Sequence, residues 1–505
     1  MAAGPEPRVV VYGSSFFTLD GVSITMRAVL AHLLGLSTGK KLGSVMVVTA
    51  DNPTPETLAK FAEDYPGVKV VNGIGGQAPL PGAEYSFGIK LDQTVMDKIS
   101  AFNPTVIHLT NPDLLAVDLA QWVCMKLPDV ALISSLHTNY VALVDFYSPV
   151  HALTKIVVMA MGWVYNVVPC TYVPSSYTQS HYAEYKWSTD LRVWGRGVDT
   201  KYLNPSKRSQ AWRDSFDLTD DDVAVLYVSR LVPEKRPLLW ADAVSAVSQE
   251  AVQARKNKVI GVCVGEGIGT VKADVGSKPG ISCVGWKSGD ELATIFASAD
   301  VLMFPSETET FGRVTLEACA SGIPCIVDQH CGGHLVTSGY NGFLVPTGGT
   351  AQDYAKELRK LAFDKELRKK CAKNARAFGE TLEKDKLMDD MIGIYKAEYE
   401  QQVVLKKRAV LQTSRVRLAL FGMSTLSIYA GVQVLNILTS FVMLFIKGPK
   451  SAEFLCGIKC VKRGFSDLFK ICYSPKGLAL LVAFALVLTH YKGVNLTQPI
   501  LDMMA

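Results

Sequence analysis

Short runs of β-branched and aliphatic residues recur along most of this chain, separated by stretches of helical length. In the first 200 residues seven such runs are predicted as strands: Val9–Tyr12, Ser44–Val48, Val68–Val71, Val106–Leu109, Ala131–Ser134, Thr171–Val173 and Leu191–Trp194. Gly21–Leu34 and Asp113–Lys126 are examples of the amphipathic stretches between them. Strands that alternate with helices are typical of a parallel sheet covered on both faces, so we expect an α/β fold.

A second series of the same kind begins near Ala224. Its predicted strands are Ala224–Val228, Val259–Val264, Ile281–Val284, Val301–Phe304 and Cys325–Val327. Residues 195–209 contain Gly, Asn and Pro and form the natural linker between the two series. We therefore predict two Rossmann-like domains that face each other across a cleft, residues 1–195 and 196–400. Helices from Asp353 to about Glu400 are expected to close the second domain.

Charge is distributed unevenly along the 505 residues. The net charge is +5, but residues 401–505 contain 13 Lys and Arg against three acidic residues, so this segment carries +10 and residues 1–400 carry −5. The acidic body argues against nucleic-acid binding, and the basic tail is typical of a membrane-facing segment. A hydrophobic content of 49% excludes global disorder. The 11 cysteines form no Cys-x-x-Cys motif, so we expect reduced thiols and a cytosolic body.

Residues 401–505 are predicted to form a membrane-anchoring tail. Leu418–Ile446 has 29 residues without a charge, which is enough to cross a bilayer with tilt or to return as a hairpin. The alternative is a buried helix of a soluble core, although buried helices of that length are rare. The shorter apolar run Gly477–Thr489 suits a re-entrant or interfacial position. The N-terminus shows neither a secretory signal nor a Ser- and Arg-rich transit segment.

The segment Pro305–Pro324 carries the most informative chemical pattern. It follows a predicted strand, so it lies at the carboxyl end of a parallel sheet, where such sheets bind ligands. Glu309 and Glu317 are eight residues apart, and a helix is expected to begin just after Gly312 between them. The free N–H groups of that helix end can bind a phosphate, while one carboxylate faces a sugar and the other a ribose. The alternative is a tight turn flanked by two solvated glutamates.

Further segments occur in the order and spacing of a known family. They are Asp20-Gly21-Val22, Ser135-Leu136-His137-Thr138, Trp194-Gly195-Arg196-Gly197-Val198-Asp199, Ser229-Arg230-Leu231 with Glu234-Lys235, and Gly265-Glu266-Gly267. With the Glu-x7-Glu spacing, they resemble the retaining glycosyltransferase family 4 over about residues 8–400. The resemblance implies a GT-B fold. Within the family, the pattern is most similar to UDP-sulfoquinovose:diacylglycerol sulfoquinovosyltransferases and to GDP-mannose-dependent α-mannosyltransferases that act on lipids.

The resemblance also implies roles for individual residues. The expected catalytic residues are His137, Glu309, Arg230 and Lys235, and the expected substrate-binding residues are Gly21, Arg196, Phe311, Gly312 and Glu317. The two catalytic cations would neutralise a departing diphosphate, and the histidine and Glu309 would contact the transferred sugar. Since cations can stabilise that leaving group, we expect neither a metal nor another cofactor. The alternatives are an ordinary surface Arg–Lys pair and a core histidine.

The resemblance predicts a retaining glycosyltransferase that moves a hexose-type sugar from a nucleoside-diphosphate donor to a lipid acceptor. Its partners would be the donor, the lipid and a membrane, with no nucleic acid. The catalytic domains would face the cytosol, or a plastid membrane if the N-terminus is incomplete. The family is thought to substitute on the same face of the sugar, with a donor phosphate oxygen taking the acceptor's proton. An enzyme with a soluble acceptor and a non-catalytic membrane scaffold that retains the fold are the alternatives.

Overall fold

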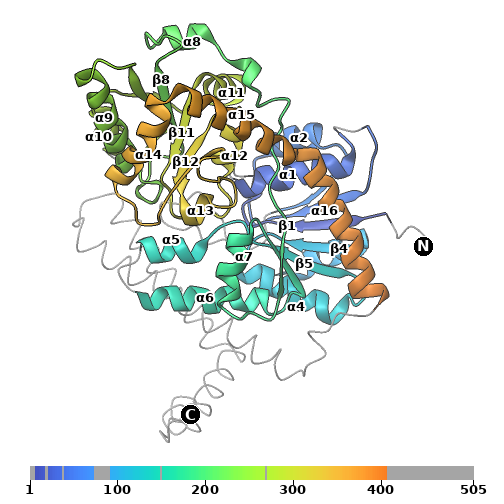
Figure 1. Cartoon of the computed structure of the whole chain (residues 1–505). Helices are drawn as coiled ribbons and strands as arrows, with labels where there is room; N and C mark the ends of the chain where they lie inside the picture. The colour runs from blue at the N-terminus through green and yellow to red at the C-terminus, as the bar shows by residue number, and fades with distance from the viewer. Residues whose placement is uncertain are drawn as a thin grey trace, which may run out of the picture. The chain divides into compact units, whose positions relative to one another are not determined.

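Two parallel β-sheets, each flanked by helices, organise the part of the chain that the structure describes (Figure 1). In this computed structural model the described residues are 6–17, 21–36, 39–72, 91–147, 151–267 and 270–405. All of them belong to a single unit, Met1–Val410. The two sheets confirm the predicted pair of parallel α/β domains.

The first sheet has seven strands in the order β3-β2-β1-β4-β5-β6-β7. The strands are β1 (Arg8–Tyr12), β2 (Ser44–Val48), β3 (Lys69–Val71), β4 (Val106–Leu109), β5 (Ala131–Ser135), β6 (Cys170–Val173) and β7 (Asp190–Val193). The helices between them are α1 (Gly21–Leu34), α2 (Pro55–Asp64), α3 (Gln93–Phe102), α4 (Leu114–Lys126), α5 (Tyr140–Tyr147), α6 (His151–Tyr165) and α7 (Ser176–Ala183). All seven predicted strands are present, each within one residue of the expected bounds.

The second sheet has six strands in the order β10-β9-β8-β11-β12-β13. They are β8 (Val223–Val228), β9 (Val259–Val264), β10 (Ile281–Gly285), β11 (Val301–Phe304), β12 (Cys325–Asp328) and β13 (Gly342–Val345). Its helices are α8 (Gln210–Asp214), α9 (Pro237–Gln253), α10 (Val271–Gly276), α11 (Gly289–Ser298), α12 (Arg313–Ala320), α13 (Gln329–Gly332), α14 (Ala351–Phe363) and α15 (Lys365–Thr381). The sequence-based prediction omitted β13, a strand of four residues at the edge of the sheet.

Central strands are buried on both faces, which explains why they read as continuous apolar runs. Val9, Val10 and Val11 of β1 are fully buried, and so are Val225 and Leu226 of β8. Strands with helices on both faces have no solvent side on which polar residues could alternate. Burial of such side chains stabilises each sheet by roughly 1.5–3 kcal/mol per residue.

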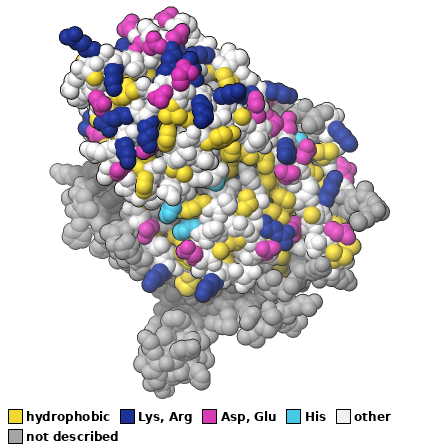
Figure 2. Space-filling model, in the orientation of Figure 1, with side chains coloured by type: hydrophobic (Ala, Val, Ile, Leu, Met, Phe, Trp, Pro, Cys, Tyr) yellow, Lys and Arg dark blue, Asp and Glu magenta, His cyan; other side chains and the backbone are white. Residues whose placement is uncertain are grey.

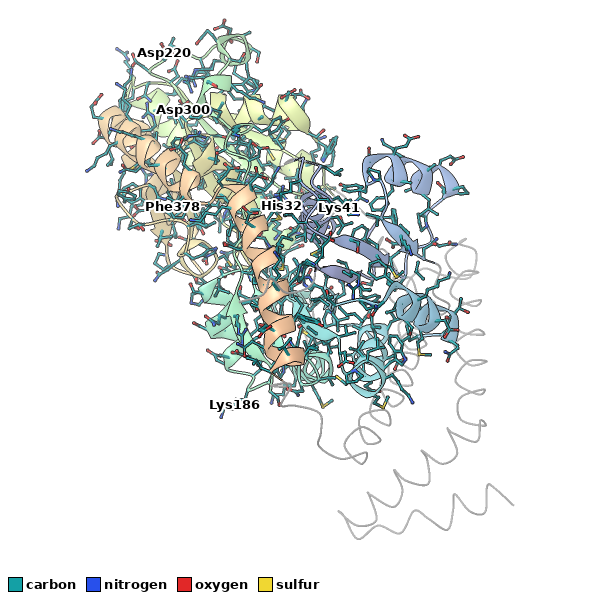
Figure 3. The ribbon with its side chains drawn as sticks, turned by 90° about the vertical axis from the view of Figure 1, so that its right-hand side faces the viewer. His32, Lys41, Lys186, Asp220, Asp300 and Phe378 are labelled. Carbon is teal, nitrogen blue, oxygen red and sulfur yellow. The ribbon has the colours of Figure 1, made fainter. Side chains whose placement is uncertain are left out.

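The helix α16 (Lys384–Tyr399) returns from the second sheet to the first. It packs against α1 and β5, and His32 of α1 lies beside it with its Nε2 2.7 Å from Oδ1 of Asp389 (Figure 3). The short helix η3 (Glu400–Val404) continues along β5, where the Gln402 side chain bonds both backbone groups of Leu132. The expectation that all helices up to about residue 400 close the second domain is therefore wrong for α16, whose buried face covers the first sheet.

The predicted membrane segments 418–446 and 477–489 lie outside the described residues, and so does Asp20. Among the helices that are described, none has the length and apolar character needed to span a bilayer. The membrane-anchoring tail therefore stays a prediction.

Candidate active site

Loops from both sheets meet at the carboxyl ends of their strands. In the second sheet, β8 has β9 on one side and β11 on the other, so the crossover connections leave in opposite directions between β8 and β11. In the first sheet, β1 lies in the same way between β2 and β4. Crevices at such switch points are where open parallel sheets bind ligands. Most of the predicted site residues follow β5, β8 and β11.

An ion pair joins the loops that follow β8 and β11. Lys235 ends the 3-10 helix η2 (Pro233–Lys235), and its Nζ lies 2.5 Å from Oε1 of Glu309. The side chains are 17% and 20% exposed, so the pair is largely withdrawn from solvent. The Ser306 hydroxyl donates to the same Glu309 oxygen at 3.1 Å. Among the described residues these two partners occupy Oε1, and Oε2 can accept a hydrogen bond from a ligand.

Arg230 lies in the same region on a loop with a fixed backbone. Gly265, at the end of β9, has φ +142°, and a Cβ there would lie 1.9 Å from the carbonyl oxygen of Ser229. Only glycine permits this close approach. The neighbouring Glu266 carbonyl accepts the N–H of Leu231 at 2.8 Å. The Arg230 side chain is exposed and has no ion pair among the described residues, which leaves its guanidinium available to an anion.

Gly312 begins the helix that the motif predicts. It is the N-cap of α12 with φ +82°, a left-handed conformation that strongly favours glycine. The first turn of α12 contains no acidic residue, so its free N–H groups and the positive end of its dipole have no built-in carboxylate partner within that turn. Phe311 is buried just before it and packs against His334 at 5.1 Å between ring centroids.

Glu317 lies on α12 and lines a cavity of about 360 Å³. Its Oε1 accepts a hydrogen bond from Nε of Arg313 at 2.9 Å. The cavity also takes in residues of α1, the linker, α11 and α16; its apolar wall includes Ile24, Ala28, Leu292, Phe296 and Met388. Glu309, Lys235, Arg230 and His137 do not line it. The two glutamates of the motif therefore face different parts of the cleft.

Arg196 lines the same cavity from the linker. Its guanidinium donates to the carbonyl oxygens of Trp194 and Gly195 at 2.9 and 3.2 Å and lies 4.6 Å from the Trp194 ring centroid. No carboxylate among the described residues pairs with it. Burial, together with the nearby charge of Arg313, lowers the pKa of Arg196 to about 9. A cation that lacks a counter-ion and lines a cavity is suited to bind an anion.

His137 follows β5 and has partners at both ring nitrogens. Nε2 lies 2.6 Å from the Ser135 hydroxyl, and Nδ1 lies 3.0 Å from Nη2 of Arg196. Burial, followed by the charge of Arg196, lowers the pKa of His137 well below its ordinary value. His137 is therefore neutral near pH 7. Its Nδ1 lone pair can accept from another donor only when Arg196 has moved away.

The loop after β11 also bridges the two sheets directly. The Thr310 hydroxyl donates to the His137 carbonyl at 2.9 Å. In return, the Thr310 carbonyl accepts hydrogen bonds from the hydroxyls of Ser175 and Thr178 at the start of α7, at 3.0 and 2.8 Å. Figure 2 shows histidine side chains near the middle of the face that it draws. The contacts of Thr310 hold the loop after β11 against the first domain.

The structure therefore places the predicted residues in two neighbouring groups. Lys235 and Glu309 form one with the helix end at Gly312, and Arg196 and Glu317 line the cavity. Gly21 is the first residue of α1, and no atom lies within 4 Å of a Cβ built on it. The space beside Gly21 is therefore open, and no contact in the structure assigns it to a ligand. Sequence reasoning missed Thr310, although it lies inside the motif. It also gave no role to His108, whose position at the end of a strand resembles that of His137.

No group of three or more potential metal ligands is present within the described ranges. The expectation that the reaction needs no metal is not tested by this observation and stays a prediction.

Comparisons with known proteins bear on the family and the fold of this chain. Residues 208–378 match the family model described as glycosyl transferases group 1, so this segment is a glycosyltransferase group 1 domain. The chain is 28% identical over 349 residues to a sulfoquinovosyl transferase of Arabidopsis thaliana. The aligned residues make up 66% of this chain and 62% of that protein. It is 29% identical over 345 residues to a GDP-mannose-dependent alpha-mannosyltransferase of Corynebacterium glutamicum, which covers 67% and 76%.

Solved structures share the fold. The Anabaena protein HepE, solved in complex with UDP and glucose, is 18% identical with a TM-score of 0.58 and covers 77% of this chain and 99% of its own. Sucrose-phosphate synthase from Thermosynechococcus elongatus is 16% identical with a TM-score of 0.57 over 77% and 98%. These likenesses support the two-domain GT-B arrangement that the sequence predicts.

Proposed function

We propose that this chain is a retaining glycosyltransferase that moves a hexose-type sugar from a nucleoside-diphosphate sugar to a lipid acceptor. The observation that carries the proposal is the ion pair between Lys235 and Glu309 at the β8–β11 switch point, with Arg230 on the loop after β8 and the N-terminus of α12 at the end of the loop after β11. Two cations and a free helix end form a site for a diphosphate, and the adjacent carboxylate forms a site for sugar hydroxyls. The matched family and relatives named as glycosyltransferases support this assignment.

The cations stabilise the leaving group. When the bond between the anomeric carbon and the donor oxygen breaks, negative charge develops on the diphosphate. Arg230 is exposed and can bind it bidentately, Lys235 supplies a second charge, and the N–H groups of α12 add to both. These groups replace the divalent ion that other transferases use, so transfer continues in EDTA.

Glu309 binds the sugar rather than attacking it. A carboxylate whose Oε1 already accepts from Lys235 and Ser306 is a weak nucleophile, whereas its Oε2 can accept from sugar hydroxyls. Transfer then takes place on one face of the sugar, and a phosphate oxygen of the departing nucleotide takes the acceptor's proton. Glu317, which lines the cavity, is suited to hydrogen-bond the ribose hydroxyls.

A lipid acceptor is favoured by two exposed methionines of the first domain and by the composition of the tail. On α6, Met161, Val164 and Tyr165 are buried whereas Met159 is 54% exposed, and Met125 of α4 is 55% exposed. Single exposed methionines do not form a membrane surface on their own. Together with the basic, apolar residues 401–505, they favour an acceptor presented at the cytosolic face of a membrane.

The donor is proposed to be UDP-sulfoquinovose, with diacylglycerol as acceptor, because a sulfoquinovosyl transferase is among the most similar relatives. The second candidate is GDP-mannose with a lipid acceptor, because the mannosyltransferase relatives match to a similar degree.

The test is a donor screen with the full-length chain in detergent. UDP-sulfoquinovose, UDP-glucose, UDP-galactose and GDP-mannose are each supplied with a total-lipid acceptor pool, with and without EDTA. Glu309→Gln is the inactive control. Glu307→Gln is the matched control. Glu307 lies two residues before Glu309 in the sequence and forms a similar ion pair, with Arg236. Transfer from one donor that Glu309→Gln alone abolishes supports the proposal. If no donor gives either transfer or donor hydrolysis, the proposal is overturned.

A further inference from the structure

A line of hydrogen bonds runs from helix α16 to the cleft through two histidines. The Tyr395 hydroxyl lies 2.9 Å from Nδ1 of His108, and Nε2 of His108 lies 2.7 Å from the Ser135 hydroxyl. The Ser135 hydroxyl in turn lies 2.6 Å from Nε2 of His137, whose Nδ1 faces Arg196. Tyr395, His108 and Ser135 are all buried, with exposures of 0%, 0% and 1%.

The arginine at the end sets the direction of every bond in this line. A guanidinium can only donate, so Nδ1 of His137 accepts and carries no proton. Neutral His137 then has its proton on Nε2 and donates it to the Ser135 oxygen. The Ser135 O–H is left to donate to Nε2 of His108, and the Nδ1–H of His108 donates to the Tyr395 oxygen. The tautomers of both histidines follow from this order.

Within the described part of the chain, Arg196 itself is held by neutral groups only. Its partners are the carbonyl oxygens of Trp194 and Gly195, the Trp194 ring and Nδ1 of His137. It lines the cavity next to Arg313, a second cation. A diphosphate that enters the cleft offers it a charge-assisted, bidentate partner, which is a stronger acceptor than an imidazole nitrogen. A diphosphate bound beside Arg196 would therefore compete with His137 for the guanidinium.

We propose that Ser135 and His108 are positioning residues that hold His137 with the Nδ1 lone pair directed into the cleft. That lone pair accepts from Arg196 in the free enzyme and from a hydroxyl of the transferred sugar once the diphosphate has recruited Arg196. The inference rests on the proposed function. It adds that His137 acts as a neutral acceptor which is available only when the donor is bound.

The chain offers a closely matched control for Ser135. Ser134 precedes it on β5, has the same 1% exposure, and bonds Thr171 Oγ1 at 2.6 Å, away from the histidines. Ser134→Ala and Ser135→Ala each remove one hydroxyl from a buried hydrogen bond on the same strand. We expect similar losses of thermal stability. Only Ser135→Ala should lower kcat, by about tenfold or more, with the donor KM changed by less than about twofold, since the diphosphate contacts remain. Ser135→Thr keeps a hydroxyl and should restore most of the activity.

A spectroscopic measurement reports on the tautomer without requiring transfer. The full-length protein is labelled with ¹⁵N-histidine, and the His137 signals are identified by their loss in His137→Asn. At pH 7.5 we expect a protonated Nε2 and an unprotonated Nδ1. Addition of UDP or GDP should shift the Nδ1 signal while Nε2 stays protonated, and in Ser135→Ala with the nucleotide bound the two tautomers should mix.

The outcomes separate this inference from the function on which it rests. A wild type with neither nucleotide binding nor transfer overturns both. A wild type that transfers sugar while Ser135→Ala has the same kcat as Ser134→Ala overturns the inference alone. A protonated Nδ1 on His137 in the nucleotide complex also overturns it, because the ring would then donate rather than accept.

Discussion

The Nζ atom of Lys235 lies 2.5 Å from Oε1 of Glu309, although the two residues belong to loops that follow different strands. In the proposed function, the pair joins the diphosphate side of the site to its sugar side. A lysine in this position both neutralises the carboxylate and fixes its orientation. Loss of either member therefore changes more than one interaction.

Replacement of Lys235 by methionine should lower kcat/KM by about 10²–10³-fold, because it removes a charge from the leaving group and leaves Glu309 without its partner. Glu309→Gln should have an effect of similar size. If the pair acts as a unit, the double variant will be little worse than either single variant. Steady-state kinetics of the three variants give the coupling.

The neighbouring ion pair supplies the control for this prediction. Arg236 Nη1 lies 2.6 Å from Oε1 of Glu307, with side chains 25% and 28% exposed. Glu307→Gln should leave kcat within about threefold of the wild type, since Glu307 bonds Arg236 and the N–H of Gly348 and has no donor contact in the proposed function. Equal losses in Glu307→Gln and Glu309→Gln would mean that both carboxylates only stabilise the loop.

Replacement of Arg230 should weaken donor binding without changing thermal stability. Its side chain is exposed and has no ion pair within the described part of the chain, so Arg230→Ala should leave the Tm unchanged. The donor KM should rise about tenfold or more, because a bidentate phosphate contact is lost. Lys373→Ala, an exposed cation on α15, is the control, and neither quantity should change in it. A Tm loss in Arg230→Ala would show that the side chain has a structural role instead.

The ends of the parallel strands could be predicted from the sequence. Because these strands are buried on both faces, each one is a continuous apolar run that stops where the strand stops. Val106–Leu109, Val259–Val264 and Val301–Phe304 have the bounds that the sequence predicts. The motif after Phe304 was placed correctly for the same reason, since position at a strand's carboxyl end follows from the strand. The edge strand Gly342–Val345 was missed, because a short run between turns looks like a loop.

Contacts between distant segments could not be read from the pattern. Nothing in the sequence indicates that Tyr395 reaches His108, 287 positions away, or that Thr310 reaches the His137 carbonyl. The path of α16 back to the first sheet creates the former contact, and the packing of the two sheets creates the latter. The part of the site that depends on one loop was therefore predictable, whereas the part that depends on packing was not.

The buried His108 should make the protein less stable in acid. Burial, followed by the charge of Arg196, lowers the pKa of His108 from 6.5 to about 3. Between these values the unfolded chain binds a proton that the folded chain does not. Protonation of His108 in the unfolded chain therefore costs no stability well above pH 6.5. As the pH drops from 6.5 toward 3, this one group lowers the free energy of unfolding by about 1.4 kcal/mol per pH unit. His137, whose pKa is lowered for the same reasons, adds to the slope.

Chemical denaturation at pH 6.5 and pH 5 measures this effect. His108→Gln has no such group, so its loss of unfolding free energy over that interval should be about 2 kcal/mol smaller than that of the wild type. His330→Gln serves as the control, because His330 is exposed in the folded chain and should leave the wild-type loss unchanged. The same acid sensitivity in His108→Gln and the wild type would contradict a neutral, buried His108.

The hydroxyl of Thr310 should contribute to closure of the cleft. It donates to the His137 carbonyl at 2.9 Å, and valine has the same shape without the donor. A net loss of about 1 kcal/mol for one hydrogen bond corresponds to a roughly fivefold lower kcat/KM in Thr310→Val. Thr310→Ser retains the hydroxyl and should stay near the wild type. Thr381→Val, which removes a hydroxyl bonded only within its own helix, should have no effect on kcat/KM. A Thr310→Val enzyme with wild-type kinetics would show that the remaining contacts of the Thr310 carbonyl with Ser175 and Thr178 are sufficient to hold the loop.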